Sequence, residues 1–463
     1  MRLLARACLT WVRLEESVLG ATWEFDSRGR KQIRHFEPGQ VACMPIQSAE
    51  NSLEAYDSER RSSKAKCEAM TRDGKQKTKR IREIYDRAEL QRWLSRPDGS
   101  VAVQGVDING LENELSEVSL AGCLFLNCEM SDALAGFLLS RRAVVIPKLT
   151  CFPFPAHRAR LYRPEELFQG FDPEQGEFGN YRECYDYLVY QHYLETGSHL
   201  ADIDVTFARS LHDHSMTDAR DEFVADRKMV AIMGGHDLLR SDPTYKQVAQ
   251  LARKLTQAGF TLASGGGPGA MEATHFGAYF ANLGDQEFLD ALKELGQRRG
   301  IIDEAKEYKD RDWLQRAYRI RQQYPLTDEQ RVAAESLAIP TWFYGHEPPA
   351  PFATHIAKYF ANSIREDGLL QIANYGIIFA PGNAGTVQEI FQDAAQNYYK
   401  TFGHVAPMIL WGRDYWTQDR PAWELLQALA NTPGRELMKE HVHLVDDPSE
   451  AEELISAFVP ETA

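Results

Sequence analysis

The second half of the chain alternates short apolar runs with amphipathic helical segments, and this rhythm restricts the possible folds most strongly. The apolar runs cover residues 229–233, 260–263, 337–343, 375–380 and 408–411, with a weaker run at 441–445. Helical patterns follow several of these runs, at 243–258, from 268 onward, at 351–366 and at 386–399. Such alternation is typical of βαβ units, in which helices cover both faces of a parallel sheet. Because these crossovers are nearly always right-handed, we predict an α/β fold with a Rossmann-like, doubly wound parallel sheet.

The first half of the chain lacks this regularity. The expected strands and the expected helix lie at residues 101–106, 118–127 and 181–193. We therefore predict a separate α+β N-terminal domain over residues 1–225 and a Rossmann-like domain over 226–463. The boundary lies near the charged stretch 218–222, and the polar, helix-prone segment 285–336 is predicted to be a helical insertion in the second domain.

Charge and composition exclude several classes of protein. The chain of 463 residues has 52 Lys and Arg against 67 Asp and Glu, a net charge of −15. This acidic surplus disfavours nucleic acid and anionic membranes as partners, although one basic pocket for a small anion remains possible. Charged residues at Arg6, Arg13, Glu15 and Glu16 interrupt any signal-peptide core. Seven cysteines without a CxxC pair are typical of reduced thiols, so we expect a cytoplasmic protein.

Three glycine-rich loops follow the apolar runs, at residues 233–236, 264–272 and 381–389. Ligands of open parallel sheets bind beyond the carboxyl ends of the strands, where these loops are expected to lie. Glycine allows backbone N–H groups to approach an anion, and the N-terminus of a following helix adds partial positive charge. Two of the loops lead directly into predicted helices. Together they predict a phosphate-binding cradle.

Each loop also has a simpler interpretation, because glycine between a strand and a helix often serves only the turn. Residues 265–270 satisfy a permissive dinucleotide fingerprint, but no matching acidic residue ends the next strand. The Walker pattern is absent from all three loops. An NAD-dependent oxidoreductase is therefore disfavoured.

Glu389 and Arg365 each allow two interpretations from the local pattern. Thr386 and Glu389 match the capping box, in which Glu389 would bond the start of its own helix. A catalytic carboxylate fits the same position equally well. Arg365 is either a solvated helix residue or part of a site.

The loops at 265–272 and 381–389 resemble those of the LOG ("lonely guy") phosphoribohydrolases, whose signature is PGGxGTxxE. The resemblance is closest to the larger bacterial branch, the pyrimidine/purine nucleotide 5′-monophosphate nucleosidases. That branch shares a Gly-Gly-His turn (residues 234–236), a GPGAMEA stretch (267–273) and an EPPxP stretch (347–351). The resemblance extends from the first apolar run to the C-terminus and does not cover the first 220 residues.

The resemblance implies two catalytic residues, Glu389 and Arg365. The phosphate- and substrate-binding residues that it implies are Gly234, Gly235, His236, Gly265, Gly266, Gly267, Gly269, Met271, Glu272, Gly382, Asn383, Ala384, Gly385 and Thr386. Asn383 replaces the second glycine of PGG. Asparagine tolerates left-handed backbone angles better than most residues, so we expect the turn to be kept.

The reaction implied by the resemblance is hydrolysis of the N-glycosidic bond of a nucleoside 5′-monophosphate, giving free base and ribose 5-phosphate without cofactor or metal. Glu389 would stabilise positive charge on the ribose and activate water, while Arg365 would bind the sugar-phosphate. Glu347, His346 and His236 are candidates for protonating the leaving base, and each is alternatively an ordinary loop residue. Two alternatives stay open: a cytokinin riboside 5′-monophosphate phosphoribohydrolase, and a non-catalytic nucleotide-binding sensor.

The basic run from Arg60 to Arg82 is either a solvated face or a site for a polyphosphorylated regulatory nucleotide. In the larger branch an extra N-terminal domain can bind a regulatory nucleotide, so the resemblance implies the second interpretation as a hypothesis, while a solvated face or a flexible arm is the expected role of such a charge run. It also implies a homodimer or a higher homo-oligomer, with active sites near subunit interfaces.

Overall fold

The computed structural model describes residues 21–25, 31–35, 81–175, 180–198, 202–298, 306–310 and 312–460. The chain divides into two units, Met1–Arg80 and Ile81–Ala463. In the first unit, strands β1 (Ala21–Phe25) and β2 (Lys31–His35) pair antiparallel. Most of the basic run proposed to bind a regulatory nucleotide, residues 60–80, lies outside the described residues.

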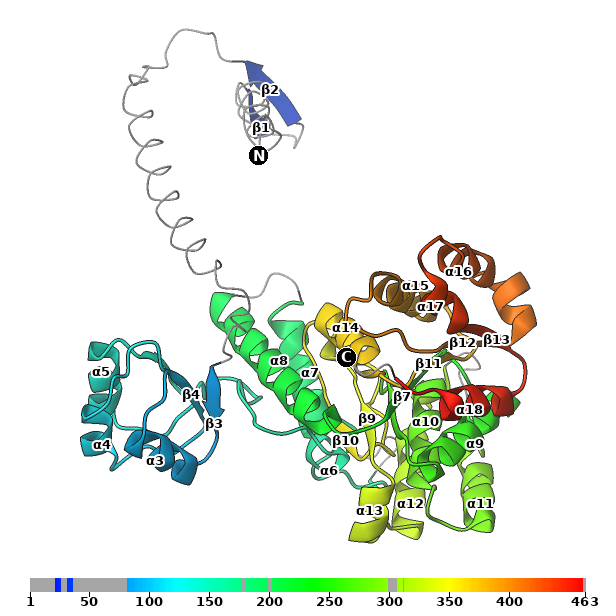
Figure 1. The fold of residues 1–463 in the computed structure, drawn as a ribbon, viewed down its shortest axis with the longest axis horizontal. Coiled ribbons are helices and arrows are strands. Elements are labelled where there is room, and N and C mark those ends of the chain that lie inside the picture. Colours follow the sequence, from blue (N-terminus) through cyan, green and yellow to red (C-terminus); the bar gives the residue numbers. More distant parts are fainter. Residues whose placement is uncertain are drawn as a thin grey trace. The chain divides into compact units, whose positions relative to one another are not determined.

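Within the described residues, the centre of the second unit is a sheet of seven strands in the order β10-β9-β8-β7-β11-β12-β13, and every neighbouring pair is parallel (Figure 1). The strands are β7 (Met229–Met233), β8 (Thr261–Ser264), β9 (Ser336–Ala338), β10 (His355–Ile356), β11 (Ile377–Phe379), β12 (Met408–Trp411) and β13 (Val442–Val445). The chain winds outward from β7 to β10 and then returns to the other side of β7 for β11. This order confirms the predicted α/β fold with a doubly wound parallel sheet.

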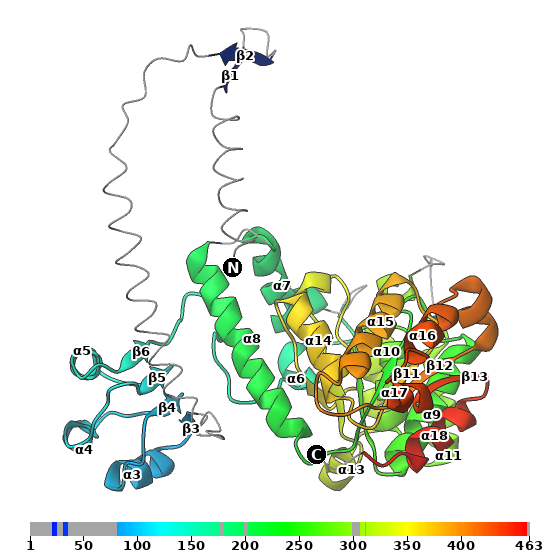
Figure 2. The ribbon, with the colours of Figure 1, turned by 45° about the horizontal axis from the view of Figure 1, so that its top comes forward.

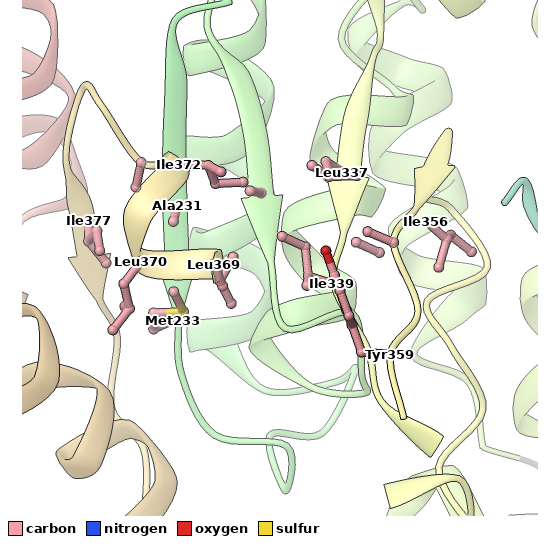
Figure 3. Close-up of a cluster of buried hydrophobic side chains, with 14 of the residues drawn as sticks. Ala231, Met233, Leu337, Ile339, Ile356, Tyr359, Leu369, Leu370, Ile372 and Ile377 are labelled. Atoms are coloured by element: carbon pink, nitrogen blue, oxygen red, sulfur yellow. The ribbon is translucent and has the colours of Figure 1, made fainter. Parts of the chain in front are cut away.

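Helices cover both faces of this sheet because its central strand is apolar on both sides. The helices are α8 (Ile203–Val224), α9 (Pro243–Gln257), α10 (Ala270–Tyr279), α14 (Asn362–Ile372), α15 (Ala384–Tyr399), α16 (Trp423–Ala430), α17 (Glu436–Glu440) and α18 (Pro448–Ala457). Val230 and Ile232 of β7 belong to the core shared with α9, α10 and α18. Ala231 and Met233 belong to the opposite core, where Leu369 of α14 approaches them (Figure 3).

The helical pattern at 351–366 proved wrong over its first part. His355 and Ile356 form β10, which pairs with β9 as the edge strand of the sheet. The helix begins only at Asn362 and continues to Ile372. The apolar residues Phe352 and Ile356 are four residues apart, which is a helical spacing, but Phe352 precedes β10 and the two side chains are buried in the cores on opposite faces of the sheet.

The segment between α10 and β9 is helical in its described residues. It contains α11 (Asp285–Leu295), the 3-10 turn η2 (Glu307–Lys309), α12 (Trp313–Gln323) and α13 (Asp328–Ala333). Arg240, which follows β7, binds this segment: its amide donates to Glu307 Oε2 at 2.7 Å and its guanidinium to the Trp313 carbonyl at 2.8 Å. The segment is thereby fixed to the loops at the carboxyl end of the sheet.

Residues 81–225 contain a second parallel sheet, whose four described strands have the order β3-β4-β5-β6. Its strands and helices are β3 (Arg82–Ile84), α3 (Arg87–Ser95), β4 (Val101–Gln104), α4 (Glu112–Ser116), β5 (Leu124–Leu126), α5 (Asp132–Ser140) and β6 (Val144–Ile146). The helix α6 (Pro164–Leu167), the turn η1 (Tyr181–Glu183), α7 (Tyr185–Glu195) and α8 follow. The proposed boundary at residue 225 falls between α8 and β7, and the division into two domains there stays a prediction. No helix in the described ranges is both long and apolar enough to cross a membrane.

Candidate active site

A cavity of about 300 Å³ lies at the carboxyl end of the large sheet. Strands β7 and β11 are neighbours there, although the chain leaves β7 toward β8 and reaches β11 only later. Such a reversal of strand order opens a crevice between the loops that follow the two strands. The predicted site residues that line the cavity are Gly234, Gly235, His236, Gly265, Gly266, Gly267, Met271, Arg365, Asn383, Ala384, Gly385, Thr386 and Glu389.

The three glycine loops are hydrogen-bonded to one another. The amide of Gly235 donates to the Pro381 carbonyl at 3.1 Å, and the amide of Ala270 donates to the Gly235 carbonyl at 3.1 Å. Gly269 lies behind the lining rather than in it, with a φ of +68°. A Cβ at this position would lie 2.3 Å from the Gly235 carbonyl oxygen. Gly269 is therefore the residue that allows the first two loops to contact each other.

Replacing Gly269 with alanine is expected to destabilise the protein by roughly 1–3 kcal/mol and to weaken ligand binding, because a strained φ and a clash with Gly235 both result. The measurement is urea denaturation together with calorimetric titration of ribose 5-phosphate. Gly136→Ala in α5 is the control, since a Cβ there meets nothing within 4 Å. Equal stability of the two variants would contradict this account of the loop contact.

A buried histidine supports the second loop from behind. His275 of α10 places Nε2 2.8 Å from Ser264 Oγ and Nδ1 3.0 Å from Ser336 Oγ. The amide of Gly266 donates to the same Ser264 Oγ at 3.1 Å. Burial lowers the pKa of His275 to about 3, so the imidazole is neutral and links β8, α10 and β9 by hydrogen bonds alone. The sequence carried no local signal for this linkage.

The third loop has a backbone that does not need a second glycine. Asn383 has φ −90° and ψ −152°, an extended conformation, so this position does not use the left-handed angles that asparagine tolerates. Its side chain lies outside the turn, with Nδ2 3.4 Å from Asp237 Oδ2. Gly382 lies behind the lining: a Cβ there would be 2.2 Å from Thr386 Oγ1, and its carbonyl accepts from Tyr415 at 2.7 Å.

The start of α15 decides between the two interpretations of Glu389. The helix begins at Ala384 with Asn383 as its N-cap, and no side chain caps it. Thr386 is thus the third residue of the helix, and the capping-box interpretation is wrong. Glu389 instead lines the cavity with its side chain 15% exposed. Its carboxyl therefore does not cap the helix.

The pKa of Glu389 is raised to about 7, chiefly because burial penalises the carboxylate. Arg365, whose Nη1 lies 3.9 Å from Glu389 Oε1, opposes the rise, while the negative charge of Glu366 adds to it. A carboxyl with this pKa exchanges its proton readily near neutral pH, as a general base must.

Arg365 is a buried, oriented cation, so its interpretation as a solvated helix residue was wrong. It lies on α14, beside α15 in both overall views (Figure 2), and is 7% exposed. Its Nε donates to the Ile339 carbonyl at 2.8 Å, and Nη2 lies 3.4 Å from the Gly265 carbonyl oxygen. A Cβ on Gly265 would lie 2.6 Å from Nη2. Because glycine has no Cβ, Gly265 leaves space for the guanidinium of Arg365.

The N-terminal end of α14 is fixed by Asp213. The carboxylate accepts from the amides of Phe360 at 2.9 Å and Ala361 at 2.8 Å, just before the helix begins. His212 Nδ1 lies 3.1 Å from the same carboxylate. Asp213 lies within α8 and is far from Arg365 in sequence, so only the folded chain shows that it orients the helix carrying Arg365.

Glu272, which the resemblance implies as a substrate-binding residue, does not line the cavity. Its side chain is fully buried away from the cavity, and its carboxylate accepts from Arg240 Nε at 2.8 Å and from Tyr245 at 3.0 Å. Successive helix residues point about 100° apart, so Met271 faces the cavity while Glu272 faces Arg240. Glu272 thus anchors Arg240, which in turn binds the helical segment after α10.

Further cavity residues were not anticipated from the sequence; they are Met233, Pro340, Thr341, Tyr344, Glu366 and Gln388. Glu366 accepts from Asn362 Nδ2 at 2.7 Å and from Gln388 Nε2 at 2.9 Å, which links α14 to α15.

Of the three candidates for protonating a leaving base, Glu347 and His236 line the cavity. In the described part of the chain, no group of three or more His, Cys, Asp or Glu side chains is placed to bind a metal ion.

The chain has only limited similarity to known proteins. No protein-family profile matches the chain, and no curated protein matches it. Among solved structures, a molybdenum cofactor binding protein from Rippkaea orientalis is 14% identical, covering 50% of this chain and 96% of that one, with a TM-score of 0.31. A molybdenum cofactor carrier protein from Chlamydomonas reinhardtii is 13% identical, covering 50% and 99%, with a TM-score of 0.29.

Proposed function

We propose that the chain is a nucleoside 5′-monophosphate phosphoribohydrolase, which cleaves the N-glycosidic bond to give free base and ribose 5-phosphate. One observation carries the proposal. A desolvated carboxyl, Glu389, and a buried cation, Arg365, face the same cavity as three interlinked glycine loops. The N-terminus of α15 opens into that cavity at Ala384 and Gly385, and helix N-termini favour phosphate.

The cavity residues suit each step of this reaction. Backbone N–H groups of the glycine loops and Arg365 bind the 5′-phosphate and the sugar, which fixes the reacting carbon. Breaking the bond develops positive charge on the ribose, and the Glu389 carboxylate stabilises it. The same carboxylate takes a proton from the attacking water, a contribution of roughly 10²–10⁴ in rate.

The direct test is incubation with a panel of purine and pyrimidine nucleoside 5′-monophosphates, followed by chromatography for free base and ribose 5-phosphate. The panel includes a cytokinin riboside 5′-monophosphate, which tests the alternative substrate class in the same site. Release of base supports the proposal. Nucleotide binding without any released base would overturn it in favour of the non-catalytic sensor.

Turnover is expected to rise as the pH increases through about 7, because Glu389 must lose its proton before it can accept one from water. Its raised pKa keeps the carboxyl neutral below that value and ionised above it. The measurement is kcat for a cleaved nucleotide between pH 5.5 and 8.5. A rate already at its plateau near pH 5 would contradict the assignment of Glu389 as the base.

The partners implied by the family resemblance remain part of this proposal. A homo-oligomer is expected, and sedimentation velocity is the measurement that tests it. A regulatory nucleotide is expected to change the rate of turnover when added to the full chain.

A further inference from the structure

A second carboxyl, that of Glu347, lines the same cavity as Glu389. It follows the 3-10 turn η3 (Trp342–Tyr344), and its amide donates to the Tyr344 carbonyl at 2.9 Å. The amide of Ala350 donates to the Gly266 carbonyl at 2.8 Å. The turn that carries Glu347 is therefore attached to the second glycine loop.

The Glu347 carboxyl is largely shielded from water, and its ion pair with His346 is long. Its side chain is 14% exposed. The half-exposed imidazole of His346 lies 3.8 Å from Oε1. A Cβ on Gly267 would lie 3.2 Å from Oε2, so the carboxyl lies directly against the glycine loop.

The charges around Glu347 come from several elements. Burial raises its pKa, and Asp237 adds to that rise. His236, Arg365 and Lys306 oppose the rise. The net direction is upward, so this carboxyl keeps its proton to a higher pH than a solvated glutamate does.

We infer that Glu347 is the general acid that protonates the departing base, an inference that rests on the proposed nucleotide hydrolysis. The C1′–N bond breaks, its electron pair stays with the base, and the base takes the proton of Glu347. The water oxygen bonds to C1′, and its proton passes to Glu389. The step ends with Glu347 ionised and Glu389 protonated, and proton exchange with solvent restores both.

The two histidines suggested by the sequence fit this role less well. His346 is not part of the cavity lining, and its side chain is 51% exposed. Burial and the nearby cations Lys306 and Lys309 lower the pKa of His346, which makes it a poor proton carrier at neutral pH. His236 lines the cavity, but its Nε2 lies 2.9 Å from the carboxylate oxygen Oδ1 of Asp237, which competes with a substrate for this nitrogen.

The test compares two substrates that differ in how much protonation their leaving group needs. One is a nucleoside 5′-monophosphate cleaved by the unmodified protein; the other is 4-nitrophenyl β-D-ribofuranoside 5-phosphate, whose nitrophenolate leaves without a proton. Glu347→Gln is expected to lose roughly 10²–10⁴ in kcat on the nucleotide and to keep most of its kcat on the nitrophenyl compound. Glu389→Gln is the matched control and is expected to lose turnover on both.

Equal loss of kcat on both substrates in Glu347→Gln would overturn the assignment, while nucleotide cleavage by the unmodified protein would leave the proposed function intact. If the unmodified protein cleaves neither substrate, the proposed function itself fails. A pH profile of the unmodified protein gives a second test that needs no variant. An alkaline decline in kcat on the nucleotide that is absent with the nitrophenyl compound supports the assignment, and identical profiles overturn it.

Discussion

Replacing Glu389 with glutamine is expected to lower kcat by roughly 10²–10⁴ without lowering the melting temperature. The amide neither accepts the proton of water nor stabilises positive charge on the ribose. Because α15 begins at Ala384 without a side-chain cap, no helix-terminal hydrogen bond is lost. The measurements are kcat on a cleaved nucleotide and a thermal melt.

The difference in stability between the unmodified protein and this variant should also depend on pH, because only the unmodified protein has the Glu389 carboxyl. The pKa of Glu389 rises from 4.5 to about 7 on folding, so the folded protein holds this proton more tightly than the unfolded chain. The resulting stabilisation is present below pH 4.5 and is lost as the pH increases through about 7. Glutamine has no carboxylate to bury in its ionised form. The free energy of unfolding of Glu389→Gln should therefore increase relative to that of the unmodified protein as the pH rises from 5 to 8.

Glu453→Gln, at an exposed position of α18, is the matched control and should change neither kcat nor the pH dependence of melting. A Glu389→Gln variant that melts much earlier and retains its kcat would show that the carboxyl is structural. That result would remove the main support for the proposed hydrolysis.

Replacing Lys358 with methionine is expected to destabilise the protein by about 3–5 kcal/mol. Lys358 and Asp186 are both buried, with Nζ 2.6 Å from Oδ1. The Asp186 carboxylate also accepts from Trp342 Nε1 at 3.1 Å and from the Tyr181 hydroxyl at 2.9 Å. Removing the lysine leaves a buried carboxylate without its counter-charge, and burial makes that costly. Urea denaturation measures the change in free energy of unfolding.

An exposed pair provides the control for this prediction. Lys254 Nζ lies 3.0 Å from Glu452 Oε2, with the lysine side chain 56% exposed. Lys254→Met is expected to change the free energy of unfolding by about 1 kcal/mol or less, because water screens the pair. Combining Lys358→Met with Asp186→Leu should recover much of the loss, since no charge then remains buried. A small effect of Lys358→Met alone would contradict this account.

The large sheet was predictable because strands buried on both faces are continuous apolar runs. The run at 229–233 coincides with β7, and the run at 408–411 coincides with β12. The helix predicted over 351–366 was wrong in its first part because the strand there lies at the edge of the sheet and is not a continuous apolar run. The strand β10 has only two residues, and a strand this short cannot be distinguished from part of a helical pattern until its neighbour β9 is known.

The loops of the site were also predictable, because glycine follows the apolar runs directly. Local patterns could not assign the carboxyls, however. Glu272 and Glu389 both follow glycine loops at the start of helices, yet Glu272 binds Arg240 and Glu389 faces the cavity. Arg240 lies 32 residues before Glu272, and no short-range signal connects them.

The order of residues alone therefore specified a parallel sheet and three glycine turns at its carboxyl end, since both follow from local apolar periodicity and backbone freedom. The folded chain decided which side chains meet in the cavity. The direction of a side chain depends on where its helix begins and on which distant residue packs against it. For this reason Arg365, Glu347 and Glu389 converge on one cavity although they come from α14, the turn after η3 and α15.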